Sequence, residues 1–363
     1  MKKKIIFFHL FNNYSGSPRV LADVISIVKN NYDIVLVTSN TEGFLSSLNV
    51  ETRLINYDWS NNKLITLFRF IYAQLNFIFF ALKYSKSDTI FYINTQQPSI
   101  AGFIGKILRV PVVFHIHETS ISQKYFGKIY KLIRKYVNGF EVFVSNYIYQ
   151  KEIINKDCSE IIYNTISTQV EDVSLKSNYK YKYNDFFNVL MICSMRDYKG
   201  IPEFSQIAQI LQVDESIKFN LLLDGSERDI RKFMFSKEIP SNVSIHSRSN
   251  SPERYLKECS LLLNLSRTDQ WIETFGLTVL EAINFGIPCI VPPIGGPTEI
   301  IDDGINGYCI SSYDINTISK KIKVLSQNKI KTMELSRQSK LKSDFFSRDK
   351  FRKQILIFLN KIK

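Results

Sequence analysis

Short apolar runs alternate with segments of helical periodicity along most of this 363-residue chain. The runs are continuous rather than alternating, which is typical of strands in a parallel sheet covered on both faces. Two series of such strands and helices predict an α/β protein with two Rossmann-like domains. The ten predicted strands are Ile5–Leu10, Ile34–Thr38, Thr89–Asn94, Val110–His117, Glu141–Ser145, Asn188–Cys193, Phe219–Leu223, Val243–Ser247, Leu261–Leu265 and Cys289–Pro292.

The two series are expected to meet in the polar segment Asp172–Phe186, which has no apolar stripe at helical spacing. We therefore predict a first domain over residues 1–178 and a second over 179–345. A C-terminal helix over 346–363 is predicted from its apolar residues at helical spacing. Ligands of open α/β sheets bind beyond the carboxyl ends of the strands, so two facing sheets predict a cleft between the domains.

The longest apolar stretch runs from Leu64 to Leu82 and approaches the length of a transmembrane helix. Arg69, Gln74 and Asn76 interrupt it. This pattern favours a buried or partly interfacial helix of the first domain over a membrane span.

The composition of the chain is ordinary except for its net charge. The hydrophobic and charged shares, 45% and 22%, are ordinary for a globular protein, but the net charge of +13 is not. A basic surface suits nucleic acid, an anionic membrane or phosphorylated substrates, and the chain carries no nucleic-acid-binding motif. The five scattered cysteines are typical of free thiols in a reducing compartment. The lysine-rich start is interpreted as a first strand rather than a signal peptide, so a cytoplasmic protein is predicted.

The segment Trp271–Ala282 carries the most information about chemistry, because two glutamates stand eight residues apart around a predicted helix start. At a helical rise of about 1.5 Å per residue, Glu273 and Glu281 would lie about 12 Å apart, which suits one elongated ligand rather than one metal. The free N–H groups of the helix start favour phosphate. We therefore predict a sugar nucleotide, with sugar hydroxyls near Glu273 and ribose hydroxyls near Glu281. The predicted contacts at the helix start are Thr274, Phe275, Gly276 and Leu277.

The run from Trp271 to Tyr308 resembles the group 1 glycosyltransferases, also called glycosyltransferase family 4. It contains, in order, a Glu-x7-Glu motif, a Gly-x-Pro turn, a Gly-Gly-Pro-x-Glu turn and an Asp-Gly-x-x-Gly turn, and their agreement makes the resemblance specific. The turn residues are Gly286, Pro288, Gly295, Gly296, Pro297, Glu299, Asp303, Gly304 and Gly307. Weaker similarity is found at Asn13–Ser17, His115–Glu118, Val144–Ser145, Ile162–Asn164 and Ser194–Gly200.

The resemblance implies the GT-B fold, in which two Rossmann-like domains face a central cleft and the final helix crosses back to the first domain. It also implies transfer of a sugar from a nucleoside diphosphate donor, with retention of anomeric configuration and without a required metal. The sequence contains no Asp-x-Asp, the pattern with which some glycosyltransferases hold a divalent ion. No metal and no other cofactor is therefore expected.

Without a metal, cationic side chains and helix N-termini must neutralise the departing diphosphate. Arg196 and Lys199 follow the predicted strand Asn188–Cys193, where a loop would face the cleft. Arginine offers phosphate a planar fork and lysine a point charge. Two solvated surface cations are the alternative, but Gly200 and the strand-to-helix position favour a phosphate site and a catalytic role. Two further predicted donor contacts are Gly225 and Arg248.

The first domain is predicted to bind the acceptor. His115 and His117 flank one residue, so they should point to the same face of a strand. Such histidines are often core residues, and no further ligand at suitable spacing completes a metal site. The resemblance places His117 near the reacting carbon, as a catalytic residue, and leaves His115 structural. The other predicted acceptor contacts are Ser15, Gly16, Ser17 and Glu118, of which Gly16 also permits close approach to donor phosphate.

The segment Lys124–Lys135 interleaves basic and aromatic residues. It fits either an interfacial helix on anionic lipid or a helix with a solvated basic face. The family resemblance favours the membrane, because that family often works on lipid-linked acceptors.

Together these features predict a retaining, metal-independent hexosyltransferase that uses a nucleotide sugar. Its acceptor would be a glycan or a lipid-linked precursor of a surface polysaccharide, such as O-antigen, capsule or lipopolysaccharide, at the inner face of the cell membrane. A sugar-nucleotide 2-epimerase of the same fold and a catalytically silent relative that binds nucleotide or membrane are the alternatives. A nucleic-acid partner is not expected.

Overall fold

The computed structural model describes residues 2–58, 60, 62–85, 88–120, 126–247 and 252–362. The chain divides into two compact units: unit 1 is Met1–Asn164 with Arg348–Lys363, and unit 2 is Thr165–Ser347. The chain therefore enters unit 2 before the polar segment Asp172–Phe186, whose first residues belong to helix α6 (Thr168–Leu175). This helix buries only two of its side chains, which explains why the sequence shows no apolar stripe there.

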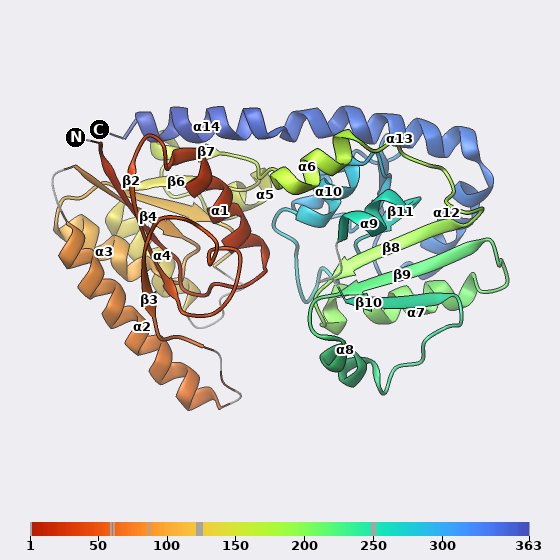
Figure 1. The fold of residues 1–363 in the computed structure, drawn as a ribbon, viewed down its shortest axis with the longest axis horizontal. Helices are drawn as coiled ribbons and strands as arrows, with labels where there is room; N and C mark the ends of the chain where they lie inside the picture. Colours follow the sequence, from red (N-terminus) through yellow and green to blue (C-terminus); the bar gives the residue numbers. More distant parts are fainter. Residues whose placement is uncertain are drawn as a thin grey trace. The chain divides into compact units, whose positions relative to one another are not determined.

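Unit 1 is built on a seven-stranded parallel sheet in the order β3-β2-β1-β4-β5-β6-β7 (Figure 1). Every neighbouring pair in the sheet is parallel. The four central strands are almost entirely buried, as their unbroken apolar runs predict. The strands are β1 (Lys4–Phe8), β2 (Asp33–Ser39), β3 (Glu51–Ile55), β4 (Thr89–Asn94), β5 (Val112–Ile116), β6 (Phe140–Phe143) and β7 (Ser159–Ile161).

Helices cover the sheet of unit 1, and the last helix of the chain is among them. An ion pair of 2.9 Å between Arg348 and Asp23 ties α14 to α1. This confirms the prediction that the C-terminal helix returns to the first domain. The helices are α1 (Gly16–Val28), α2 (Lys63–Tyr84), α3 (Ser99–Ile107), α4 (Gly127–Val137), α5 (Asn146–Glu152), η1 (Lys156–Cys158) and α14 (Arg348–Asn360).

Unit 2 has a six-stranded parallel sheet in the order β10-β9-β8-β11-β12-β13. Its strands are β8 (Phe187–Cys193), β9 (Ile217–Leu223), β10 (Val243–Ser247), β11 (Leu261–Leu263), β12 (Cys289–Val291) and β13 (Gly307–Cys309). Its other helices are η2 (Asp197–Lys199), α7 (Ile201–Ile210), α8 (Glu227–Met234), α9 (Pro252–Lys257), α10 (Leu277–Asn284), α11 (Pro297–Ile300), α12 (Ile315–Gln327), α13 (Lys329–Ser343) and η3 (Asp344–Phe346). The predicted fold class, two Rossmann-like α/β units, is confirmed.

All ten predicted strands are present, but three observed strands were not predicted. These are β3, β7 and β13, and each lies at the edge of its sheet. An edge strand has only one neighbour to bury it, so its residues need not form an apolar run. In β3 and β7 most positions are exposed or half-buried. The sequence signal is therefore weakest where the sheet ends.

In each sheet the strand order reverses at one point, and the connections on its two sides run in opposite directions along the sheet. We call this point the switch point of the sheet. In unit 1 this point lies between β1 and β4, and in unit 2 between β8 and β11. Loops that leave the carboxyl ends of such strands diverge and create the usual ligand crevice of an open α/β sheet. Functional residues are therefore expected at the two switch points.

Candidate active site

The strands at the switch point of unit 2 bring Lys199 and Glu273 together. Lys199 ends the short helix η2 after β8, and Glu273 lies in the loop after β11. The Lys199 Nζ atom lies 2.5 Å from Glu273 Oε1, and both side chains are mostly buried. Ser266 Oγ donates a further hydrogen bond of 2.9 Å to the same oxygen. Two residues predicted separately thus form one charge pair.

The Glu273 carboxyl is held in its ionised form. Burial acts to raise its pKa, but the charge of Lys199 and hydrogen bonds from Lys199, Ser266 and Trp271 outweigh burial, so the pKa lies below its ordinary value. The Lys199 ammonium also lies 5.0 Å from the centroid of the Trp271 ring, which stacks on Tyr198 at 5.7 Å. The Glu273 carboxylate therefore stays ionised at neutral pH, beside an aromatic surface.

The helix predicted near Phe275 is α10, and it begins at Leu277 after Gly276. Glu273 precedes the helix, so the 12 Å estimate for a helical segment between the glutamates does not hold for this backbone. Gly276 has φ 101°, and no side chain caps the first turn. Its leading N–H groups are therefore available to a phosphate oxygen. Glu281 lies on the inner side of α10 with 3% of its surface exposed.

Gly295 and Gly296 support the loop that carries Glu273. A Cβ atom at Gly295 would lie 2.5 Å from the Glu273 carbonyl oxygen, and one at Gly296 would lie 2.3 Å from the Cα of Phe275. Gly296 N–H also donates to the Glu273 carbonyl at 2.8 Å. The Gly-Gly turn thus lets two backbones meet where any side chain would collide. Gly200, with φ 89°, likewise lies against the Leu265 carbonyl.

The remaining predicted donor contacts are more scattered. Arg196 is exposed beside η2, and among the described residues no carboxylate pairs with it. Gly225 follows β9 with φ 129°, close to Met195, and its carbonyl accepts a hydrogen bond of 2.8 Å from Ser247. Arg248 lies outside the described residues. Arg196 is therefore the cation of this loop that is open to an anionic ligand.

The switch point of unit 1 gathers a cluster of neutral polar side chains. Asn94 ends β4, and its Nδ2 lies 3.2 Å from the Ser17 carbonyl and 3.1 Å from His9 Nδ1. A carbonyl oxygen only accepts, so the amide nitrogen faces it and the amide oxygen faces His117 Nε2 at 2.9 Å. In a neutral imidazole the other nitrogen, His117 Nδ1, is then a hydrogen-bond acceptor.

The predicted glycine loop lies beside this cluster. Gly16 begins α1, and Ser15 donates from its N–H and its hydroxyl to Asn13 Oδ1 at 2.9 and 2.5 Å. The Ser17 carbonyl is the group that Asn94 contacts. The loop and the histidine are therefore linked through Asn94.

Burial keeps the three histidines near this cluster uncharged. It lowers the pKa of His9 to about 4, although hydrogen bonds to the Asn94 and Phe11 carbonyls oppose the shift. Burial also lowers the pKa of His115 to about 3. The pKa of His117 lies well below its ordinary value, through burial and then the charges of the other two. The ring centroids of His115, in β5, and His117, which follows β5, are 4.3 Å apart, so the two side chains lie on the same side as predicted.

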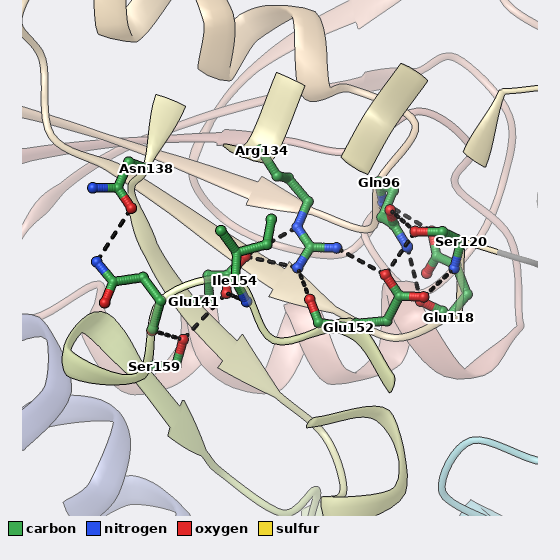
Figure 2. Close-up of polar contacts among 10 residues, drawn as sticks. Gln96, Glu118, Ser120, Arg134, Asn138, Glu141, Glu152, Ile154 and Ser159 are labelled. Carbon is green, nitrogen blue, oxygen red and sulfur yellow. Dashed lines mark hydrogen bonds and ion pairs between the residues drawn. The ribbon is translucent and has the colours of Figure 1, made fainter. Parts of the chain in front are cut away.

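Glu118 follows His117 and belongs to a buried hydrogen-bond network (Figure 2). Its Oε1 accepts from the Gln96 N–H at 2.8 Å, and its carbonyl accepts from the Gln96 side chain. Burial raises its pKa to about 7, although the Gln96 hydrogen bond and the Arg134 charge oppose the shift. The carboxyl therefore titrates closer to neutral pH than an ordinary glutamate does.

Arg134 lies at the centre of the same network and is fully buried in α4 (Figure 2). It pairs with Glu141 at 2.7 Å and with Glu152 at 3.2 Å. Both oxygens of Glu152 accept from Ser120, at 2.6 Å each. The ion pairs inside unit 1 therefore fix the segment after β5 that carries His117 and Glu118.

The sequence interpretation missed three residues of these clusters: His9, Asn94 and Ser266. Each is a polar residue at, or just after, the carboxyl end of a buried strand. That position is the signal that could have identified them, because strand ends at a switch point line the ligand crevice.

Other features of the described residues lie apart from these clusters. No group of three or more His, Cys, Asp or Glu side chains within them is arranged to hold a metal ion. A pocket of about 420 Å³ in unit 2 is lined by residues such as Gln206 and Lys237. It contains none of the predicted site residues.

Comparison with known proteins gives the class of the chain. The family model of glycosyl transferases group 1 matches residues 176–342, which lie in unit 2. The structure is similar to that of Anabaena HepE in complex with UDP and glucose, with a TM-score of 0.79 and 16% identity over 99% of this chain and 100% of that one. The chain is thus a glycosyltransferase of the GT-B type.

Two of the relatives that are similar in sequence come from bacteria. A poly(ribitol-phosphate) alpha-N-acetylglucosaminyltransferase of Staphylococcus aureus is 28% identical over 41% of this chain, and the match spans 30% of that protein. An uncharacterized protein in the cps region of Klebsiella pneumoniae is 25% identical over 76% of this chain and 78% of its own length.

Proposed function

We propose that this glycosyltransferase is a retaining, metal-independent enzyme of family 4. Unit 2 binds a nucleoside diphosphate sugar, and unit 1 binds a glycan or lipid-linked acceptor. The product is a precursor of a surface polysaccharide, made at the cytoplasmic face of the membrane. The observation that carries the proposal is the Lys199–Glu273 pair beside the start of α10.

The donor site follows from the chemistry of the leaving group. A diphosphate develops negative charge as the sugar departs, and this charge must be met by groups already in place. Lys199 uses one of its three N–H donors on Glu273, which leaves others for phosphate oxygens. Arg196 and the leading N–H groups of α10 add to the same field.

Glu273 has a different task in this proposal. Its carboxylate remains ionised and accepts hydrogen bonds from sugar hydroxyls, while Lys199 turns toward the phosphate. Glu281 binds the ribose hydroxyls, and Gly276 and Leu277 contact the diphosphate. Lys199 therefore pairs first with Glu273 and then with the phosphate of the bound donor.

On the acceptor side, His117 meets the sugar as a neutral hydrogen-bonding group. Its Nδ1 atom accepts from a hydroxyl, because Nε2 donates to Asn94. Glu118, with a pKa near 7, is the nearby group that can take or give a proton.

Retention and the polysaccharide pathway rest on the comparisons. The staphylococcal relative is named for an alpha-linked product on poly(ribitol-phosphate), and the Klebsiella relative is encoded in a cps region. UDP in the Anabaena structure supports a uridine nucleotide as the first donor to test.

The test is a thermal-shift screen against UDP, GDP, UDP-glucose and UDP-N-acetylglucosamine, followed by transfer assays with the stabilising sugar. A ligand at 100 times its Kd should add about 2.7 kcal/mol of stability. Transfer should persist in excess EDTA and yield the α-anomer. Loss of activity in EDTA that added Mg²⁺ restores would refute metal independence. Epimerised donor formed without acceptor would instead identify an isomerase.

A further inference from the structure

The long helix α2 exposes an apolar stripe along its outer side. Its 22 residues have the length and composition of a membrane span, yet only 17% of its most apolar window is buried. The exposed side chains recur at helical spacing, and Phe68 is 70% exposed. The members of the stripe are Leu64, Phe68, Ile71, Tyr72, Leu75, Phe79 and Leu82. An exposed patch of this size marks an interaction surface.

The inner side of α2 is held in the core of unit 1. Ala73, Phe77 and Ala81 are fully buried, and the Phe77 ring packs edge-on against Phe8 of β1 at 5.9 Å. In Figure 1 the orange helix α2 runs along the outside of unit 1. A helix anchored along one side in this way cannot cross a bilayer, and it presents its other side to a partner.

Two further helices lie beside α2 on the same face of the sheet. The ring of Phe70 in α2 contacts Phe126 at the start of α4 at 5.4 Å, and Phe103 of α3 contacts Tyr136 of α4 at 5.3 Å. The outer side of α4 exposes Leu132 and Tyr136. It also exposes three lysines, which are Lys128, Lys131 and Lys135. We name the outward side of α2, α3 and α4 the basic apolar surface.

The charge on this surface has a single sign. The three helices contain no Asp and no Glu. Besides the lysines of α4, the exposed cations are Lys63, Arg69, Lys83 and Lys106. A second copy of the chain on this surface would place cations against cations, which disfavours a self-association interface. Apolar side chains among lysines, without acidic residues, match the acyl and headgroup layers of an anionic bilayer.

We propose that the basic apolar surface docks unit 1 on anionic lipid. Helix α2 lies in the plane of the interface, with its stripe among the upper acyl chains and the lysines of α4 on the headgroups. The sequence predicts lipid contact at Lys124–Lys135, of which Lys124 and Tyr125 lie outside the described residues, and a buried or partly interfacial helix at Leu64–Leu82. Here α2 supplies the apolar anchor and α4 the charge. This proposal deepens the proposed function. It rests on that function in one respect, which is that the membrane would supply the acceptor.

The test is flotation with vesicles of phosphatidylcholine alone or mixed with phosphatidylglycerol. The variant Phe68→Ser/Leu75→Ser/Phe79→Ser removes the centre of the stripe. The control Val213→Ser/Phe235→Ser/Ile330→Ser changes three apolar residues of unit 2 that are more exposed than those of the stripe, and Phe235 is 92% exposed. Wild type and control should float with the anionic vesicles, and the stripe variant should bind them at least about ten-fold more weakly. Lys128→Gln/Lys131→Gln/Lys135→Gln should reduce binding and its dependence on salt.

A second measurement does not depend on removing apolar residues. The variant Leu75→Trp should show blue-shifted emission and quenching by brominated lipid only with anionic vesicles. Unaltered emission, or flotation of the stripe variant equal to wild type, would overturn the proposal. A dimer in solution that the stripe variant dissociates, without vesicle binding, would also overturn it and assign the surface to a second copy.

Failure of this surface is separable from failure of the enzyme assignment. The stripe variant should retain donor binding and transfer to a water-soluble acceptor, because none of its substitutions contacts the switch-point residues. If wild type floats but binds no nucleotide sugar, the proposed function fails and the docking surface remains.

Discussion

The two switch points of this glycosyltransferase differ in the charge of the side chains that they bring together. In unit 2, Lys199 and Glu273 form a charged pair, and the lysine keeps the carboxyl ionised although burial opposes it. In unit 1, burial keeps His117 and the neighbouring histidines uncharged, and a hydrogen bond between neutral groups links His117 to Asn94. A charged site suits a diphosphate, whereas a neutral one suits sugar hydroxyls.

The difference shows that burial alone does not decide the protonation state of a site. Glu273 has a cation 2.5 Å away and stays charged. His117 lies beside an amide oxygen and two other histidines, and burial keeps it neutral. Unit 1 does contain buried charges, but Arg134 and its two glutamates hold the loop after β5 instead of facing a ligand (Figure 2). The most direct test of this difference between the units is to remove the charge from each unit in turn.

The largest effect is expected from Lys199→Ala. Loss of a preorganised cation at the leaving group should lower kcat about 10²- to 10³-fold, as for other transition-state donors. The neighbouring cation Lys237, which pairs with Asp197, provides the control, and Lys237→Ala should leave kcat within about two-fold. Steady-state kinetics with saturating acceptor measure both variants.

A double-mutant cycle sharpens this prediction. Because Lys199 and Glu273 contact each other, Lys199→Ala/Glu273→Ala should be less impaired than the product of the single effects. Strict additivity would show that the two side chains act separately and would contradict the assignment of one site.

The next effect concerns the structural charges of unit 1. Arg134→Met leaves Glu141 and Glu152 buried without their cation, so the free energy of unfolding should fall by about 3–5 kcal/mol. Arg337→Met breaks an exposed pair with Glu334 and should leave the free energy of unfolding almost unchanged. Urea unfolding followed by circular dichroism distinguishes them, and equal losses would remove the central role given to Arg134.

The same contrast explains how far the sequence predicts the site. The residues of unit 2 come from one short motif and one loop, so their spacing already suggested a joint role. The residues of unit 1 come from the ends of β1, β4 and β5, and only strand pairing brings His9, Asn94 and His117 together. The sequence indicates that Arg134 belongs to a basic helix face, yet among the described cations of α4 it is the one that is buried. The periodicity of the helix does not reveal that Arg134 pairs with Glu141 and Glu152.

Fold prediction had a similar limit. Central strands buried on both faces, such as β4, were predicted to the residue. Edge strands β3, β7 and β13 were missed, since one-sided burial leaves no continuous apolar run. The apolar length of α2 was evident in the sequence, but the division into an inner anchored side and an outer stripe depends on the sheet it packs against.

A smaller effect is expected from acidification. The folded-state pKa values of His9, His115 and His117 lie below the unfolded value near 6.5, so the folded chain binds fewer protons and stability falls as pH drops below 6.5. Each histidine contributes about 1.4 kcal/mol per pH unit. Glu118, whose pKa is raised to about 7, opposes one of the three down to its unfolded pKa of about 4.5.

Hydrogen exchange resolved by peptide is the measurement. Protection of β4 and β5 should fall between pH 7 and pH 5, after correction for intrinsic exchange, more than that of β8 and β9. His115→Gln should reduce the slope in unit 1 by about 1.4 kcal/mol per pH unit. Equal slopes in both units would contradict the neutral histidine cluster.

The smallest effect tests whether Glu118 meets the acceptor. Its pKa of about 7 makes it a protonated acid below neutrality and a carboxylate above it. If the carboxylate accepts a hydrogen bond from the acceptor, KM for acceptor should fall a few-fold as pH rises through 7, with kcat less affected. Glu118→Gln keeps the shape of the side chain and removes the titration, so its KM should be flat over this range. A pH-dependent KM that survives in Glu118→Gln would assign the titration to another group and leave His117 as the acceptor contact of unit 1.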